Sequence, residues 1–258
     1  MEWALSTAYD VAAMVKHQVC IIPIGCLEPH ATHLPTGNDA MIAHKWALLV
    51  AEREQVVVLP PLFYAYTKPV RHLPGTLSLD TPVVLALLEN VCDEVARNGF
   101  KKIILLNVHG GNSSVLDVFR QHISDRGKDY GLYLLPPFIM QDVIEEIRET
   151  QDWGHACEIE TSLSLYLFPE LCHMERLPTG YSRSKKDYDV GQAATQIDWF
   201  ASYPETYVGD AHKASKEKGE RLTRVQVDRL VEMVRKIKAD ENVLIHIRKY
   251  NKRAEGKR

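Results

Sequence analysis

Two carboxylates and two imidazoles lie close together in the stretch 21–39, and side chains of these types can bind a divalent metal. Glu28, His30 and His33 follow a short apolar run, and Asp39 lies beyond a loop that contains proline and glycine. On an extended segment, residues two apart point to the same face, so we expect Glu28 and His30 to project together. The alternative is a set of unrelated roles, in which Asp39 or its neighbour caps a helix beginning at 40 and each histidine is satisfied by hydrogen bonds.

A second candidate is the sequence Asn-Val-His-Gly-Gly-Asn at 107–112. His109 would stand at the end of a buried strand, and Gly110 and Gly111 would allow a tight backbone turn and the close approach of a ligand. The alternative is an ordinary turn between a strand and a helix, with Asn112 as the cap of that helix.

The third candidate is the run from Asp152 to Glu160, which places His155, Glu158 and Glu160 at the start of a predicted helix. The helix dipole favours carboxylates near an N-terminus, so these acids could be ordinary charges of a helix start. Trp153 in the same run could belong to the core. This run becomes a candidate for a site because of the other two stretches.

Buried strands that alternate with amphipathic helices predict how these stretches are positioned. We expect an α/β fold with one parallel sheet covered on both faces, in which ligands bind outside the carboxyl ends of the strands. The stretch 170–220 has no clear pattern, and the basic tail 249–258 should fray. The expected strands are 19–25, 56–60, 102–107, 132–136 and a last one at 242–247, and the expected helices are 8–17, 40–53, 82–98, 113–126, 139–149, 158–168 and 221–239.

Length and composition indicate an ordinary globular chain and exclude several classes of partner. The 258 residues, 45% hydrophobic and 25% charged, suit a single domain over 1–258. The net charge of -3 gives no electrostatic argument for nucleic acid or an anionic membrane. No apolar run approaches the roughly 20 residues that span a bilayer. The five cysteines contain no CxxC pair, so we expect reduced thiols in a cytoplasmic protein, with Cys26 and Cys157 as small packing groups.

Carboxylates and imidazoles around two metal ions suit a hydrolase, because the metals lower the pKa of a bound water and polarise the carbonyl that it attacks. A nearby histidine can then give a proton to a leaving nitrogen. The chain has no GxSxG element and no GxGxxG after a strand, so a serine nucleophile and a nucleotide-binding Rossmann domain have little support. Mixed nitrogen and oxygen ligands suit zinc, manganese or iron.

The three stretches together resemble the creatininase (creatinine amidohydrolase) family. Two further elements, Pro-Gly-Thr and a Gly-Asp to Gly-Glu run, also match, so the resemblance covers most of the chain. The family's signatures correspond to Gly25 through Asp39, 74–76, 107–112, 155–162 and 209–220.

The resemblance implies a three-layer α/β/α sandwich, two divalent metal ions, a small-molecule substrate and a homo-oligomer, often a hexamer. Carried over by position, Glu28 and His109 would bind one metal and His30 the other. Asp39 would bridge the two metals.

The resemblance also assigns catalysis and substrate binding. Glu160 would be the remaining metal ligand and part of the catalytic pair, with Glu158 as the alternative ligand. His155 would be the acid or base that contacts the substrate, whereas His33 would either support a metal ligand or be structural. The residues expected to contact the substrate are Gly110, Gly111, Asp152, Trp153 and His72.

Several departures from the family pattern bear on the substrate. Creatinine-cleaving members carry a Tyr-Glu pair, whose Glu is a metal ligand, where this chain has Gly110 and Gly111, and this favours a substrate other than creatinine. Ala31 and Cys157 each replace a family glycine. The loop before residue 74 carries basic residues that suggest an anionic or polyhydroxylated ligand, namely Lys68, Arg71 and His72.

The predicted activity is metal-dependent hydrolysis of a C–N bond, in a cyclic amide or a formamide, of a small polar molecule. Candidates within the family are a ring-opening amidohydrolase, a deformylase of the kind in archaeal flavin synthesis, and a peptidase that trims a redox-peptide precursor. The alternatives are a family hydrolase that breaks a C–C bond of a keto-inositol, and a metal-binding protein of the same fold without catalysis.

Overall fold

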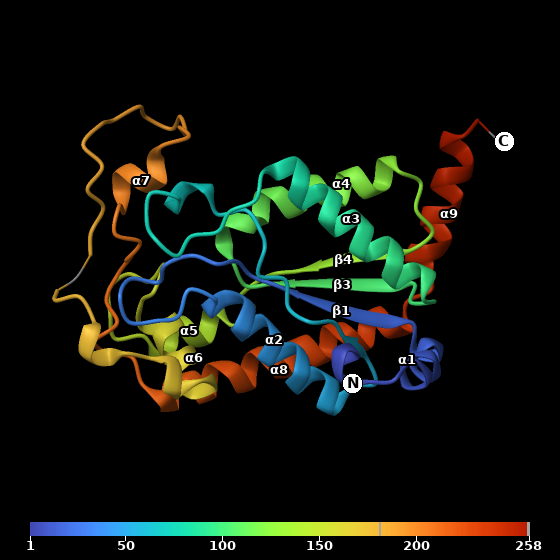
Figure 1. Cartoon of the computed structure of the whole chain (residues 1–258), viewed down its shortest axis with the longest axis horizontal. Coiled ribbons are helices and arrows are strands. Elements are labelled where there is room, and N and C mark those ends of the chain that lie inside the picture. Colours follow the sequence, from blue (N-terminus) through green and yellow to red (C-terminus); the bar gives the residue numbers. More distant parts are fainter. Residues whose placement is uncertain (181, 257–258) are drawn as a thin grey trace.

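A four-stranded parallel sheet forms the centre of the computed structural model, which describes residues 1–180 and 182–256 (Figure 1). Its register pairs Ile21 with Ile104, and Ile104 with Tyr133. The first four runs predicted as strands all belong to it, which confirms the α/β class. In chain order the strands are β1 (Val19–Ile24), β2 (Val57–Val58), β3 (Lys102–Asn107) and β4 (Gly131–Leu135). In the sheet they lie side by side in the order β2-β1-β3-β4.

Helices cover both faces of the sheet and make three layers, as predicted (Figure 1). Because side chains alternate along a strand, Val19 and Ile21 pack into one hydrophobic cluster and Cys20 and Ile22 into the other. The first cluster also contains α2 (Asn38–Arg53), α5 (Gln141–Ile147), α6 (Glu158–Leu167) and α8 (Lys216–Ala239), and the second contains α1 (Ala8–Met14), α3 (Thr81–Arg97) and α4 (Ser113–Asp125).

The stretch 170–220 had no clear pattern, and its described part before α8, residues 170–180 and 182–215, is largely irregular and arches away from the sheet around the short helix α7 (Asp198–Ser202) (Figure 1). α8 follows it and begins before the predicted residue 221, because the Ser215 hydroxyl caps the helix by accepting a hydrogen bond from the N–H of Lys218 at 3.3 Å. Short 3₁₀ helices span Trp3–Leu5, Val15–His17, Lys68–Val70, Gly110–Asn112, Pro169–Leu171 and Met174–Arg176.

The strand expected at 242–247 is wrong, because this segment is the first half of helix α9 (Asn242–Ala254). The Asp240 carboxylate accepts hydrogen bonds from the first two N–H groups of α9, at 3.3 and 3.0 Å, and so starts the helix. Leu244 is the buried residue of α9. The expected fraying of the tail is also wrong up to residue 254, since Asn251 donates a hydrogen bond to the carbonyl of Lys128 at 3.1 Å. Among the described residues, no helix has the length and apolar content to cross a membrane.

Candidate metal centre

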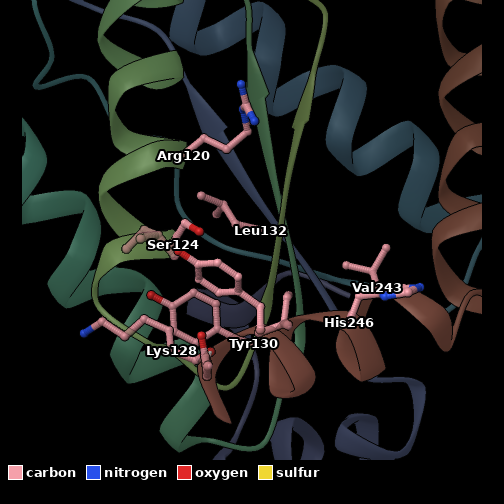
Figure 2. A pocket seen from close by; sticks show the side chains of 11 residues that line it. Arg120, Ser124, Lys128, Tyr130, Leu132, Val243 and His246 are labelled. Carbon is pink, nitrogen blue, oxygen red and sulfur yellow. Dashed lines mark hydrogen bonds between the residues drawn. The ribbon is translucent and has the colours of Figure 1, made fainter. Parts of the chain in front are cut away.

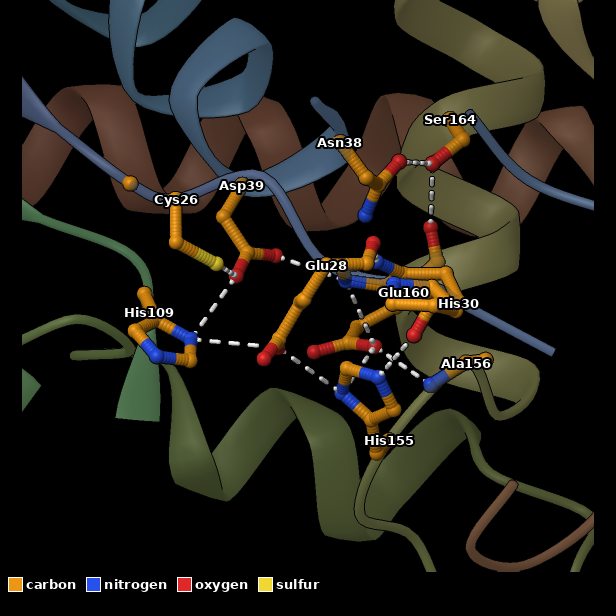
Figure 3. A network of polar contacts seen from close by, with 12 residues as sticks. Cys26, Glu28, His30, Asn38, Asp39, His109, His155, Ala156, Glu160 and Ser164 are labelled. Carbon is orange, nitrogen blue, oxygen red and sulfur yellow. Dashed lines mark hydrogen bonds and ion pairs between the residues drawn. The ribbon is translucent and has the colours of Figure 1, made fainter. Parts of the chain in front are cut away.

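The carboxyl ends of β1 and β3 carry a buried cluster of acids and histidines (Figure 3). The segment after β1 contributes two of these residues, the segment after β3 contributes one, and the first turn of α2 contributes a fourth. The start of α6 closes the cluster from the other side. The members are Glu28, His30, Asp39, His109, His155 and Glu160, and each is less than 8% exposed.

Asp39 lies at the centre of this cluster, between two imidazoles (Figure 3). Its Oδ1 is 2.8 Å from Nε2 of His30, and its Oδ2 is 3.1 Å from Nδ1 of His109. Gly25 makes this possible, because a Cβ there would lie 2.1 Å from the backbone nitrogen of Ala40. α2 begins at residue 38 after Gly37, so neither Asp39 nor its neighbour is the helix cap of the alternative interpretation.

Each of the three histidines is oriented by a hydrogen bond to a backbone carbonyl. His30 donates from Nδ1 to the carbonyl of Glu28 at 3.1 Å, His109 from Nε2 to that of Tyr66 at 3.0 Å, and His155 from Nε2 to that of Pro29 at 2.9 Å. A carbonyl can only accept, so the opposite ring nitrogen of a neutral imidazole keeps its lone pair. In all three residues that nitrogen faces the carboxylates, which is how metal-binding histidines are held.

The His-Gly-Gly-Asn turn positions His109 in two ways. The side chain of Asn112 does not cap the following helix. Its amide instead donates hydrogen bonds to the carbonyl of Gly25 at 3.0 Å and to the side-chain oxygen of Asn107 at 3.1 Å. These bonds connect the end of β3 to the end of β1. Gly111 leaves room for the imidazole, because a Cβ at this position would lie 2.5 Å from Nε2 of His109. A glutamate at residue 111 would therefore require His109 to move.

The structure separates the two glutamates of α6, although both are buried. Glu158 points away from the cluster, where Lys218 Nζ lies 2.5 Å and Thr150 Oγ1 lies 2.6 Å from its carboxylate. Oε2 of Glu160 lies 3.9 Å from both His30 Nε2 and His155 Nδ1. Of the two candidate ligands, Glu160 is thus the one that joins the cluster.

Opposite charges overcome the cost of burial at Glu28 and His30, whereas burial raises the pKa of Glu160. Burial opposes ionisation of Glu28, but His109 and His155 lower its pKa to about 2. Burial also opposes protonation of His30, but the Asp39 carboxylate outweighs it and raises the pKa of His30 to about 9. The negative charge of Glu28 and Asp39 is therefore balanced by protons on His30 and His109. Divalent cations can take the place of such protons, so these side chains fit a metal site.

The donor atoms fall into overlapping groups that could each hold an ion. One group is Cys26, Glu28, Asp39 and His109, and another is His30, Asp39 and Glu160. A third combines Glu28, His30 and His155. Within each group the ligand atoms lie within 4.8 Å of one another. Asp39 belongs to the first two groups, one through each carboxylate oxygen.

The residues expected to contact substrate lie around this cluster rather than in it. Gly110 and Gly111 are exposed, and a Cβ on Gly110 would meet no atom within 4 Å. Trp153 is half-buried against Phe138, with ring centroids 5.9 Å apart, so packing explains it at least in part. His72 donates from Nε2 to the carbonyl of Pro204 at 2.6 Å. Exposed Asp152 lines a separate hollow of about 620 Å³ with Trp153.

Sequence reasoning missed two side chains beside the cluster. The hydroxyl of buried Thr67 donates a short hydrogen bond to Oε2 of Glu28. The Trp199 ring lies edge-on to His155, with centroids 5.9 Å apart. Both residues come from segments without a periodic pattern, although the apolar Trp199 and Phe200 within a polar stretch were a usable signal.

A hollow of about 480 Å³ is lined by residues from the loop before residue 74 and from the segment that leads into α7. It begins at Tyr66, whose carbonyl orients His109, and extends past His72 to Phe200. Lys68 also lines it, but its ammonium group pairs with Asp80 at 2.5 Å, which weakens the argument from basic residues for an anionic ligand.

A further hollow, of about 440 Å³, lies between α4, β4 and α9 (Figure 2). Tyr130 and Leu132 line it, so it lies at the amino end of β4, away from the edge where parallel sheets bind ligands. Its Lys128 is paired with Glu89 at 2.8 Å and with Asp93 at 2.6 Å. This hollow is therefore a poor candidate for the catalytic site.

Comparison with known proteins identifies the family. The family model for creatininase, described as creatinine amidohydrolase, matches residues 4–234. The chain belongs to the creatininase family. The resemblance inferred from the motifs is thus confirmed, and with it the prediction of a hydrolase of this type.

Relatives in the creatininase family differ in what they act on. The creatinine amidohydrolase of Pseudomonas putida is 27% identical, over 88% of this chain and 92% of its own. The 3-dehydro-scyllo-inosose hydrolase of Thermotoga maritima is 29% identical, over 84% of this chain and 76% of its own. A zinc–zinc form of a mutant creatininase superposes with a TM-score of 0.79 and 26% identity, covering 93% of this chain and 98% of that one.

Ala31, at the family's glycine position, adopts φ = +51°, a left-handed conformation that glycine prefers. Ala31→Gly should therefore raise the free energy of unfolding by about 0.5–1 kcal/mol, because it removes the steric cost of the side chain. Thermal unfolding would measure this. Ala86→Gly, at an exposed position inside α3, is the matched control and should lower stability by about 1 kcal/mol. A destabilised Ala31→Gly variant would contradict the role of strain.

Proposed function

We propose that this member of the creatininase family is a metal-dependent hydrolase that cleaves a C–N bond, in a cyclic amide or formamide, of a small polar molecule. The observation that carries the proposal is the position of Asp39, whose two oxygens face two differently oriented imidazoles. A carboxylate placed in this way can bridge two ions. The donor set suits zinc, manganese or iron.

The proposed ligands divide around Asp39. Glu28 and His109 hold one ion, with Oε1 of Glu28 lying 3.2 Å from Nδ1 of His109. His30 and Glu160 hold the other. When bound, such ions lower the pKa of a water and polarise the scissile carbonyl.

His155 is the proposed acid or base. Its Nε2–H is committed to the carbonyl of Pro29, so Nδ1 is the atom that exchanges a proton. Nδ1 lies 3.7 Å from Glu28 Oε1 and 3.9 Å from Glu160 Oε2, at the edge of the ligand cluster. From there it can give a proton to the leaving nitrogen. On one side the ring contacts that of His30, with centroids 4.2 Å apart and the two planes tilted by 38°.

The substrate is proposed to lie over Gly110 and Gly111, with His72, Asp152 and Trp153 at the margins of its site. Gly110 and Gly111 stand where creatinine-cleaving members carry a Tyr-Glu pair, so this wall is open, which favours a substrate other than creatinine. We further propose that the enzyme is a cytoplasmic homo-oligomer, for example a hexamer, and that 1–258 is one domain.

Hydrolysis of a carbocyclic C–C bond is the second candidate, supported by the 29% identity to the inosose hydrolase. Protein reconstituted separately with zinc, manganese and iron should be assayed on cyclic amides, formamides, a keto-inositol and a short peptide. We expect C–N hydrolysis of at least one amide. Turnover of the keto-inositol alone would favour the second candidate, and tight metal binding without turnover would favour a non-catalytic metal protein.

A further inference from the structure

The thiol of Cys26 lies in the metal cluster rather than in the core packing expected for it. Cys26 follows Gly25 at the end of β1 and is 0% exposed. Its Sγ is 3.5 Å from Oδ2 of Asp39, the same oxygen that faces His109 (Figure 3). The sulfur therefore lies on the Glu28 and His109 side of the bridging carboxylate.

The distances around this sulfur are those between ligands of one ion. With metal–sulfur bonds of about 2.3 Å and metal–oxygen bonds of about 2.0 Å, sulfur and oxygen on a tetrahedral zinc lie about 3.5 Å apart. Sγ of Cys26 and Oδ2 of Asp39 have this separation. Nδ1 of His109 lies 3.1 Å from the same oxygen and 3.2 Å from Oε1 of Glu28. All four donor atoms lie within 4.8 Å of one another.

We propose that Cys26 is a sulfur ligand of the ion held by Glu28, Asp39 and His109. This inference rests on the proposed metal centre and adds to it. On binding, the thiol releases its proton to solvent and a sulfur electron pair forms the bond to the metal.

The two positions then differ in chemistry. The Cys26 position has four protein ligands, including a soft thiolate, so it is closed and prefers zinc over manganese. The position of His30, Asp39 and Glu160 has three nitrogen and oxygen ligands and keeps a place open for water or substrate. The exchangeable ion should therefore be the one at His30.

Cobalt reports on sulfur ligation without any assay of activity. We expect wild-type protein loaded with Co²⁺ to show a near-ultraviolet thiolate-to-cobalt charge-transfer band besides the visible bands of the ion. Cys26→Ser should lose the charge-transfer band, keep the visible bands, and weaken binding of one zinc ion by about tenfold or more. Cys157→Ser is the matched control, since Cys157 is equally buried and two residues from His155 but belongs to none of the ligand groups. It should keep the band.

The outcomes distinguish this proposal from the one it rests on. Wild-type protein that binds no cobalt would overturn the metal centre itself. Visible bands without a charge-transfer band in the wild type would overturn the role of Cys26 and leave the centre intact, whether or not the variant folds. A band that disappears in Cys157→Ser and persists in Cys26→Ser would also overturn it.

Discussion

Replacing Asp39 with alanine should reduce bound metal from about two ions per chain to almost none. The reason is that each of its oxygens faces a different set of donors, through His30 on one side and His109 on the other. Plasma mass spectrometry of the purified, reconstituted protein would measure the metal content. Circular dichroism on the same samples would show that the chain remains folded.

Two further variants sharpen the Asp39 test. Asp39→Asn keeps one oxygen acceptor and should retain about one ion, because an amide can serve one position but cannot bridge both. Asp142→Ala removes an exposed carboxylate paired with Arg229 at 2.6 Å, far from the cluster in the chain, and should leave metal content unchanged. Full metal occupancy in Asp39→Ala would refute the bridging role.

Replacing His155 with alanine should lower kcat by about 10²–10⁴-fold while both ions stay bound. None of the proposed ligands is removed, but the chain loses the group whose Nδ1 faces the acids and whose Nε2 is held by Pro29. Steady-state kinetics on the substrate found in the screen, together with metal analysis, would separate the two effects.

The matched control for this variant is His246→Ala, which removes an exposed histidine of α9 that lines the hollow of Figure 2. It should leave kcat unchanged. An unchanged rate would remove His155 from the mechanism, and loss of metal would show that it is a ligand.

Much of the fold followed from local pattern. Successive side chains of β1 and β3 point to opposite faces, which sets the helical layer that each one faces, and glycine or a polar residue ends both strands where the chain must turn. Since parallel strands share a carboxyl edge, the residues that follow β1 and β3 had to lie close together. The convergence of Glu28, His30 and His109 was predictable for this reason.

Other features depended on contacts between distant segments. The stretch 242–247 is apolar enough for a strand, but it forms a helix because Asp240 caps its first N–H groups and Leu244 is buried on one face. Trp199 contacts His155 only because the long segment that carries α7 folds so that the two rings meet. Cys26 resembled a packing residue until α2 placed Asp39 beside it.

Which of Glu158 and Glu160 joins the cluster depends on tertiary structure and not on the local sequence. The sequence by itself determined the family motifs, the sheet and the presence of two acids at the start of α6. Two residues apart on a helix, their side chains point about 200° away from each other, so only one could face the cluster. Packing of α6 against α8 decided which: Lys218 of α8 pairs with Glu158, and Glu160 is left facing His30. No local pattern fixes that rotation, because it depends on the surface against which the helix packs.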